Sequence, residues 1–180
     1  LQGLPILRVL VTHMHPDHMG LAHWLCERWQ APLWISTSEY QSAMLACSGQ
    51  SNFGGDATVK FFAAHGWTQP DELAVVSSRV GYYPSMVPKI PPTFVRLMAG
   101  ASVQIGDRSW QCISGFGHSP EHMALHDAHN QLLISGDMLL PSISTNVSVY
   151  AMEPDGNPLQ LFLDSLDKMA HLPDETLILP

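Results

Sequence analysis

The stretch Thr12-His13-Met14-His15-Pro16-Asp17-His18 brings three imidazoles and two kinds of turn-forming residue, a proline and an aspartate, into one short segment. It follows an apolar run over residues 5–11 that is typical of a buried strand. Apolar residues at helical spacing follow it over residues 19–30. The segment is therefore expected to be a loop between a strand end and a helix start, where α/β sheets present catalytic groups.

The spacing within this loop predicts a metal site. His13 and His15 are two residues apart on an extended strand end, so both side chains point to one side and can hold one ion. Asp17 and His18 turn away from that pair and can serve a neighbouring ion. Imidazoles and a carboxylate without a thiolate favour zinc, iron or manganese. The alternative is a group of surface histidines with Asp17 as a simple helix cap, and three histidines behind a buried strand disfavour it.

Two later segments extend the pattern. The order His-x-His-x-Asp-His in residues 13–18 resembles the signature of the metallo-β-lactamase superfamily. Gly117-His118-Ser119-Pro120-Glu121-His122 resembles that family's Gly-His-[Ser/Thr]-Pro-Gly-His segment, and Ser135-Gly136-Asp137 resembles its Ser-Gly-Asp segment. The three motifs occur in the family's order. The resemblance implies an α/β fold, a four-layer αβ/βα sandwich with the metals at one end of two packed sheets.

The resemblance also implies roles for single residues. The implied metal ligands are His13, His15, Asp17, His18, His118 and Asp137. The three histidines His13, His15 and His118 would hold a first ion, and Asp137 would bridge it to a second. Asp17 would also orient the attacking hydroxide and so act in catalysis. The expected cofactor is zinc, as one or two ions, with iron or manganese as alternatives.

Two residues of the second motif, Glu121 and His122, are not expected to be metal ligands. Glu121 stands where the family has a glycine and is expected to place a carboxylate beside the site. His122 occupies the family's non-ligand position, so support of the ligands is expected rather than coordination.

The function implied is that of a metal-dependent hydrolase that directs a metal-bound hydroxide at a thioester, ester or lactone, closest to the glyoxalase II-like branch. The first alternative is a phosphodiesterase or nuclease of the same fold. A net charge of −8 with only eight Lys and Arg argues against this alternative and against any nucleic-acid partner. The second alternative is a remnant that binds metal without catalysis. The expected partner is a small-molecule substrate.

The composition fits one folded domain. The chain has 180 residues, 46% of them hydrophobic and 13% charged. We expect a single, partial metallo-β-lactamase-like domain over residues 1–180, with a helical insertion at about residues 38–92. No apolar run is long enough for a membrane segment. Cys26, Cys47 and Cys112 are scattered and odd in number, which predicts free thiols in a reducing compartment and a cytoplasmic location.

The fold is expected to be incomplete at both termini. Leu1 lies almost on the first predicted strand, and residues 177–180 are typical of another strand. In the family the last metal-binding histidine follows such a strand, so we expect it beyond Pro180. The second ion is then expected to bind more weakly than the first. Unpaired strand edges would favour self-association.

Further along the chain, alternating residues predict two hairpins, over residues 102–114 and 123–135. Residues 82–92 are rich in proline and predict an extended arm, in which Tyr82 or Tyr83 offers a hydroxyl to the substrate; a plain connector is an equal alternative. Residues 141–152 are expected to be a loop. Residues 158–171 predict an amphipathic helix capped by Asn157, with Leu159, Phe162, Leu163, Leu166 and residues 169–170 on its buried face.

Overall fold

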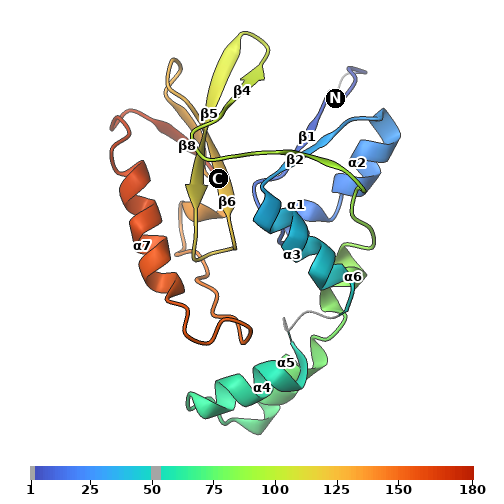
Figure 1. Cartoon of the computed structure of the whole chain (residues 1–180). Coiled ribbons are helices and arrows are strands. Elements are labelled where there is room, and N and C mark those ends of the chain that lie inside the picture. Colours follow the sequence, from blue (N-terminus) through green and yellow to red (C-terminus); the bar gives the residue numbers. More distant parts are fainter. Residues whose placement is uncertain (1–2, 50–53) are drawn as a thin grey trace.

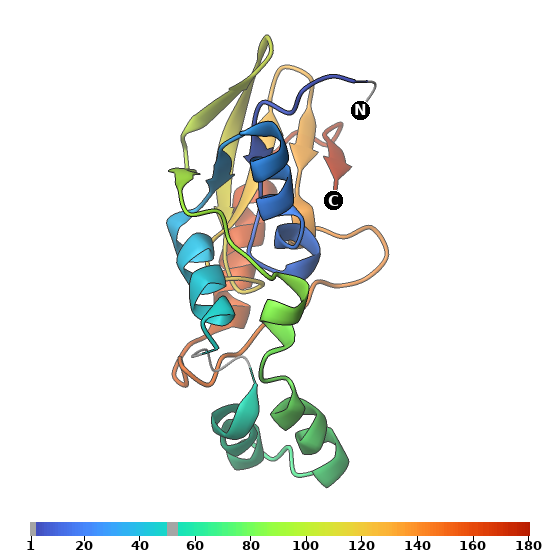
Figure 2. The ribbon, with the colours of Figure 1, turned by 90° about the vertical axis from the view of Figure 1, so that its right-hand side faces the viewer.

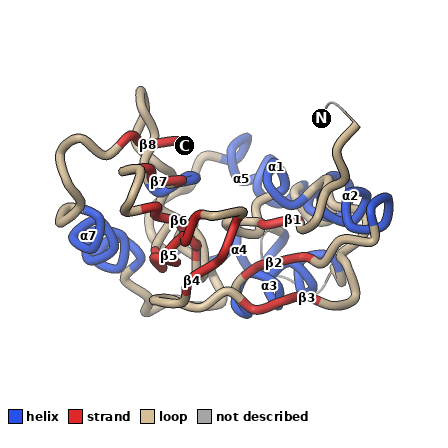
Figure 3. The backbone as a smooth tube through the Cα atoms, turned by 90° about the horizontal axis from the view of Figure 1, so that it is seen from above, coloured by secondary structure: helices blue, strands red, loops and turns tan. Residues whose placement is uncertain are grey.

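A computed structural model describes residues 3–49 and 54–180 and shows two sheets packed between outer helices (Figure 1). Seen from above, the strands of both sheets lie between α7 (Pro158–Met169) and α2 (Ala22–Trp29) (Figure 3). This is the predicted four-layer sandwich. Within the described ranges, no helix has the length and apolar character needed to cross a membrane.

The first sheet consists of three parallel strands in the order β1 (Val9–Leu10), β2 (Leu33–Ile35) and β3 (Phe94–Arg96). Successive side chains of a strand point to opposite faces of the sheet, so the residues of this sheet contribute alternately to two cores, one on each face. Val9, Leu33 and Ile35 pack outward against α2 and α3 (Thr37–Cys47). Leu10 and Trp34 point the other way, toward the second sheet.

The second sheet contains four antiparallel strands and a fifth that is parallel to its neighbour. The strands are β4 (Ser102–Ile105), β5 (Arg108–Gly115), β6 (His122–Asp127), β7 (Leu132–Ile134) and β8 (Leu177–Leu179). The central strand β6 is buried along its whole length. Its Met123 and Leu125 face the first sheet, and Ala124 faces the core under α7. Both predicted hairpins are present.

The segment between β2 and β3 is helical, and its parts differ in position. α3 packs in the core on the outer side of the first sheet, together with Tyr83 of α6 (Tyr82–Met86) and Val87, which follows α6. α4 (Gly55–Ala64) and α5 (Pro70–Ser78) pack against each other and project away from both sheets (Figure 2). The projecting part of the predicted insertion is therefore α4 and α5.

The structure corrects the prediction of an extended arm from residue 82. Residues 82–86 form α6, because Gly81 turns the chain with a φ of 83° and the Tyr83 ring is buried against the first sheet's core. Pro84 is compatible with this helix because the N–H groups of a first turn have no intrahelical acceptor. From Val87 to the start of β3 the chain forms neither a helix nor a strand. β3, which follows it, was not predicted, since a three-residue strand behind two prolines carries little pattern.

Two predicted helices also differ in detail. The helix expected over residues 19–30 begins earlier as α1 (Pro16–Met19), breaks at Gly20, and continues as α2. A Cβ at Gly20 would lie 2.7 Å from the Pro16 carbonyl oxygen, so this close turn requires glycine. α7 begins after Asn157 as predicted, and the Asn157 side chain accepts from the Gln160 N–H.

The buried face of α7 is narrower than expected. Leu159 and Leu163, which were expected inside, are exposed. Phe162, Ser165 and Met169 line the contact with the second sheet at spacings of three and four residues. Residues 141–152, predicted as a loop, contain neither a helix nor a strand.

Candidate metal centre

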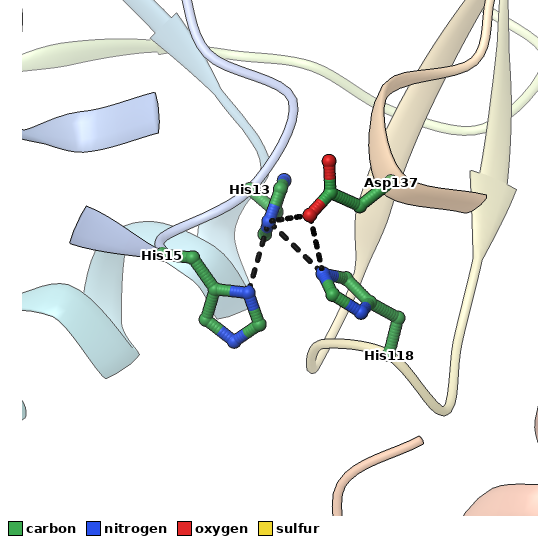
Figure 4. Close-up of side chains that lie close together, drawn as sticks. All are labelled: His13, His15, His118 and Asp137. Carbon is green, nitrogen blue, oxygen red and sulfur yellow. Dashed lines mark hydrogen bonds and ion pairs between the residues drawn. The ribbon is translucent and has the colours of Figure 1, made fainter. Parts of the chain in front are cut away.

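Three loops carry the predicted ligands to one end of the sandwich. His13 and His15 follow β1, His118 follows β5, and Asp137 lies in the 3₁₀ turn η1 (Gly136–Met138) after β7. The Met123 N–H donates to the Thr12 carbonyl oxygen at 2.9 Å, which ties the loop of the first sheet to β6 of the second. In Figure 4, His13 and His15 approach from the first sheet, and His118 and Asp137 approach from the second.

Four of the predicted ligands form a first ligand group, consisting of His13, His15, His118 and Asp137. The His13 Nε2 atom lies 3.0 Å from His15 Nδ1 and 3.1 Å from His118 Nε2. The Asp137 Oδ2 atom lies 3.4 Å from His118 Nε2 and 3.8 Å from His13 Nε2. Four possible donor atoms therefore surround one point.

The remaining predicted ligands form a second ligand group, consisting of Asp17, His18 and again Asp137. The His18 Nε2 atom lies 3.2 Å from Asp137 Oδ1 and 3.7 Å from Asp17 Oδ2. Asp137 thus turns one carboxylate oxygen toward each group, as a bridging ligand would. The side chain of Asp17 is 71% exposed, whereas that of His13 is fully buried.

Glycine makes the position of Asp137 sterically feasible. Gly136 has a φ of 46°, and a Cβ there would lie 2.6 Å from His122 Nε2. The buried His122 ring therefore packs directly under the Asp137 turn, and its centroid lies 5.0 Å from that of His13. Neither of its nitrogens has a hydrogen-bond partner within residues 3–49 and 54–180. His122 contacts the ligands but has no atom in either ligand group.

Hydrogen bonds from outside the cluster fix the ring orientations. The Asn146 carbonyl oxygen can only accept, so His118 Nδ1, 2.8 Å away, carries the proton. In the neutral ring, His118 Nε2 then presents its lone pair to the cluster. The Thr12 hydroxyl lies 3.0 Å from His13 Nδ1 and can orient that ring in the same way.

The buried histidines favour the uncharged state that metal binding requires. Burial and the neighbouring imidazoles hold the pKa of His13 far below its usual value. Burial, with a further contribution from His118, lowers the pKa of His15 to about 4. Burial, with further contributions from His118, His18 and His15, lowers the pKa of His122 to about 3. At neutral pH these rings are therefore neutral and their lone pairs are available.

The first ligand group fits a divalent metal ion. Around a tetrahedral zinc with Zn–N distances of about 2.0–2.1 Å, neighbouring ligand atoms lie about 3.3 Å apart. Four of the six separations in the first ligand group are 3.0–3.8 Å, close to this value, and all six lie within 4.8 Å. A cation among these atoms would allow each imidazole to present a lone pair to it without repulsion between the lone pairs. The donor set of imidazole and carboxylate suits zinc and iron alike.

Other residues singled out from the sequence lie around this cluster. The Glu121 carboxylate does not face the ligands, since it accepts from the Ser38 hydroxyl at 2.8 Å at the start of α3. Tyr83 is buried, and its hydroxyl donates to the Met14 carbonyl oxygen at 2.6 Å. Tyr82 is exposed. Both tyrosines, with His15, line a pocket of about 210 Å³ beside the cluster.

Glu39 supports the cluster but was not predicted from the sequence. This residue lies in the first turn of α3 and is fully buried. Its carboxylate accepts hydrogen bonds from the Met14 N–H, the Ser119 hydroxyl and the Glu121 N–H. Burial raises the pKa of Glu39, and these three hydrogen bonds act in the opposite direction. The available signal was the spacing Ser36-x-x-Glu39, but that spacing predicts a helix capping box rather than a contact with distant loops.

Comparison with known proteins agrees with this geometry. A profile of the metallo-beta-lactamase superfamily matches residues 1–180. A crystal structure of a beta-lactamase domain protein from Burkholderia ambifaria superimposes with a TM-score of 0.87 at 48% identity, covering all of this chain and 50% of that one. A protein named TTHA1623, solved in a di-iron-bound form, superimposes with a TM-score of 0.65 at 25% identity over 99% of this chain and 71% of its own.

A curated relative is similar along nearly the whole chain. The probable metallo-hydrolase YflN of Bacillus subtilis strain 168 is 23% identical over 98% of this chain. The chain spans 64% of the length of YflN and half that of the Burkholderia protein.

Proposed function

Because the chain belongs to the metallo-β-lactamase superfamily, we propose that it carries the metal site of a metal-dependent hydrolase acting on small thioesters, esters or lactones. One observation carries the proposal: His13, His15, His118 and Asp137 converge from three loops beside an open pocket. The name of the relative YflN, a probable metallo-hydrolase, supports the same class of reaction. A glyoxalase II-like specificity is part of the proposal.

Zinc is the proposed metal, with one ion in the first ligand group and a second shared through Asp137. Iron is the alternative, since the relative TTHA1623 was solved in a di-iron-bound form. When bound, such ions supply Lewis-acid activation of water and of the substrate carbonyl. The chain's own contribution is to hold three imidazoles and one carboxylate in place for them.

Asp17 is proposed to act on the attacking water. It is the most exposed of the six residues and stands at the mouth of the cluster, with Oδ2 3.7 Å from His18 Nε2. A carboxylate at this position can accept a hydrogen bond from the water and orient it toward the substrate carbonyl. His18 is in turn oriented by Asp137 Oδ1 at 3.2 Å.

The pocket beside His15 supports a small substrate rather than a nucleic acid. Met14, Tyr82, Tyr83 and Tyr150 contribute to its wall, and among the residues that the structure describes Arg79 is the only Lys or Arg that lines it. A nucleic-acid groove needs several cations along a phosphate backbone, and the net charge of −8 opposes such a partner. The lining fits an uncharged or singly charged acyl compound better.

The test is a hydrolysis assay with defined metal content. The purified protein, depleted with a chelator and reloaded with zinc, should hydrolyse p-nitrophenyl acetate and a simple acyl thioester only in the loaded state. Bis-p-nitrophenyl phosphate, a phosphodiester, serves as the competing substrate class. Hydrolysis that survives complete metal removal would contradict the proposal. A clear preference for the phosphodiester would support the alternative function.

A further inference from the structure

Glu39 is a buried acid on an outer helix whose side chain reaches the metal centre's supporting loops. One loop, residues 12–15, carries His13 and His15; the other, residues 116–121, carries His118. The two loops belong to different sheets. Glu39 comes from neither sheet, and it contacts both loops.

The contacts are short and involve both carboxylate oxygens. Oε2 accepts from the Met14 N–H at 2.8 Å, and Met14 lies between the two histidines of its loop. Oε1 accepts from the Ser119 hydroxyl and from the Glu121 N–H, each at 2.6 Å. Ser119 directly follows His118. One side chain therefore joins the backbone beside His13 and His15 to the residue beside His118.

The charge of Glu39 has no nearby counterpart in the protein. Among the residues the structure describes, no Lys, Arg or His nitrogen forms an ion pair with this carboxylate within 4 Å. Burial of an unpaired carboxylate is unfavourable, and hydrogen bonds from three donors offset only part of that cost. Cations held in the adjacent ligand groups would stabilise the negative charge further.

We propose that Glu39 is a positioning residue that couples the two ligand-bearing loops and so sets the affinity of the first ligand group for its ion. This inference rests on the proposed metal site. Glu39 touches neither the substrate nor the ligand atoms. It acts by fixing the spacing between the His13–His15 pair and His118. The second ligand group is affected less, because Asp17 and His18 lie in α1, beyond the Glu39 contacts.

Glutamine cannot replace Glu39 in this role. All three partners donate, and an amide has only one oxygen to accept with, so its NH₂ group would face a donor on one loop. Glu39→Gln therefore breaks the link to one loop while keeping the side-chain shape. Loss of such outer support typically weakens metal binding by about 10- to 100-fold.

Asp127 provides a matched control. It is also buried and also accepts three hydrogen bonds, from the N–H groups of His129 and Asn130 and from the Asn130 side chain. It lies at the β6–β7 turn, and within the described ranges these hydrogen bonds connect it to no ligand-bearing loop. Asp127→Asn should lower thermal stability and leave metal affinity unchanged, which separates positioning from general destabilisation.

The experiment is a zinc titration of the metal-free protein against a chromophoric chelator, for the wild type, Glu39→Gln and Asp127→Asn. The inference predicts that Glu39→Gln weakens the tighter binding step by about 10-fold or more and the weaker step less. An unchanged tighter step in a folded Glu39→Gln protein, or an equal loss of affinity in both steps, would overturn it.

Two other results are possible: Glu39→Gln does not fold, or the wild type binds no zinc. If Glu39→Gln does not fold, Ser119→Ala replaces it, because it removes one of the two donors to Oε1 and should still weaken the tighter step by a few-fold. An unchanged tighter step in Ser119→Ala then overturns the inference. If the wild type binds no zinc, the proposed function itself is contradicted. If the wild type and Glu39→Gln both bind zinc with the same affinity, only the inference about Glu39 is contradicted.

Discussion

The two ligand groups share Asp137 but differ in how the protein holds their other members. His13 and His118 are almost fully buried, and their far ring nitrogens have partners in Thr12, Thr145 and Asn146. In the second group Asp17 is exposed and His18 is partly exposed. Neither makes a side-chain hydrogen bond to a supporting residue within the described ranges. The first group is thus arranged before an ion arrives, and the second depends more on the ion to arrange it.

The two ligand groups should therefore bind their ions with different affinities. A preformed site loses less side-chain entropy on binding than one whose ligands must be ordered. We therefore expect the first ion to bind more tightly, which agrees with the expectation from the sequence.

The largest effect is expected from removing a buried ligand. His118→Ala should abolish binding of the first ion under dialysis and with it the hydrolysis of p-nitrophenyl acetate, because three ligands remain where four converged. Elemental analysis after dialysis measures the metal content. His171→Ala, an exposed histidine outside both groups, is the control. Full metal content in His118→Ala would remove His118 from the ligand set.

An intermediate effect is expected from the exposed group. Asp17→Asn should lower the affinity for the second ion by about 10-fold or more and lower the turnover number, while the first ion stays bound. Zinc titration gives both affinities, and steady-state kinetics gives the turnover. Equal weakening of both ions would show that the two groups form one cooperative unit and would break the contrast.

Burial of His15, and of His122 packed beside the first ligand group, should appear as a pH dependence of the metal-free protein's stability. The folded-state pKa values of His15 and His122, about 4 and about 3, lie below the ordinary value of 6.5. Between these values the unfolded chain binds more protons, so stability is fully present above pH 6.5 and is lost as the pH falls toward 4. Thermal denaturation in chelator at pH 7, 6, 5 and 4 measures this loss.

A variant tests whether the His122 ring contributes to this loss of stability at low pH. His122→Phe removes one titrating ring, and its melting temperature should fall less steeply between pH 6.5 and 4 than that of the wild type. Parallel curves for the two proteins would exclude His122 as a source of the pH dependence.

The smallest effects concern the two tyrosines of the pocket. Tyr83→Phe removes the hydrogen bond to the Met14 carbonyl and should cost about 1 kcal/mol of stability. Tyr82→Phe leaves stability unchanged, because its side chain is exposed, and is predicted to raise KM more than it lowers kcat. Chemical denaturation and steady-state kinetics measure these effects. Unchanged kinetics in both variants would leave residues 82–83 a connector with no part in substrate binding.

Much of the fold could be predicted because its signals are local. The alternation in β4 to β7 and the cap at Asn157 involve neighbouring residues, and the structure contains both features. The structure also groups His13 with His15, and Asp17 with His18, as the spacing predicts. β3 and α6 were not predicted, since a three-residue strand and a single helical turn owe their form to packing against the first sheet.

Glu39 shows what sequence spacing cannot provide. Its three partners lie 25, 80 and 82 residues away, and only the folded chain brings them together. The exposed side chains of Leu159 and Leu163 show the same limit, because a helical pattern does not reveal how wide a face the neighbouring sheet covers.

A zinc titration of the metal-free wild type tests the central claim most directly. The claim is that three loops form a ligand group, with His13 and His118 buried, that binds one ion more tightly than the more exposed group binds a second. The predicted result is two binding steps whose affinities differ by about 10-fold or more, the tighter one lost in His118→Ala. Two steps of equal affinity, or a tighter step that survives in His118→Ala, would contradict the claim.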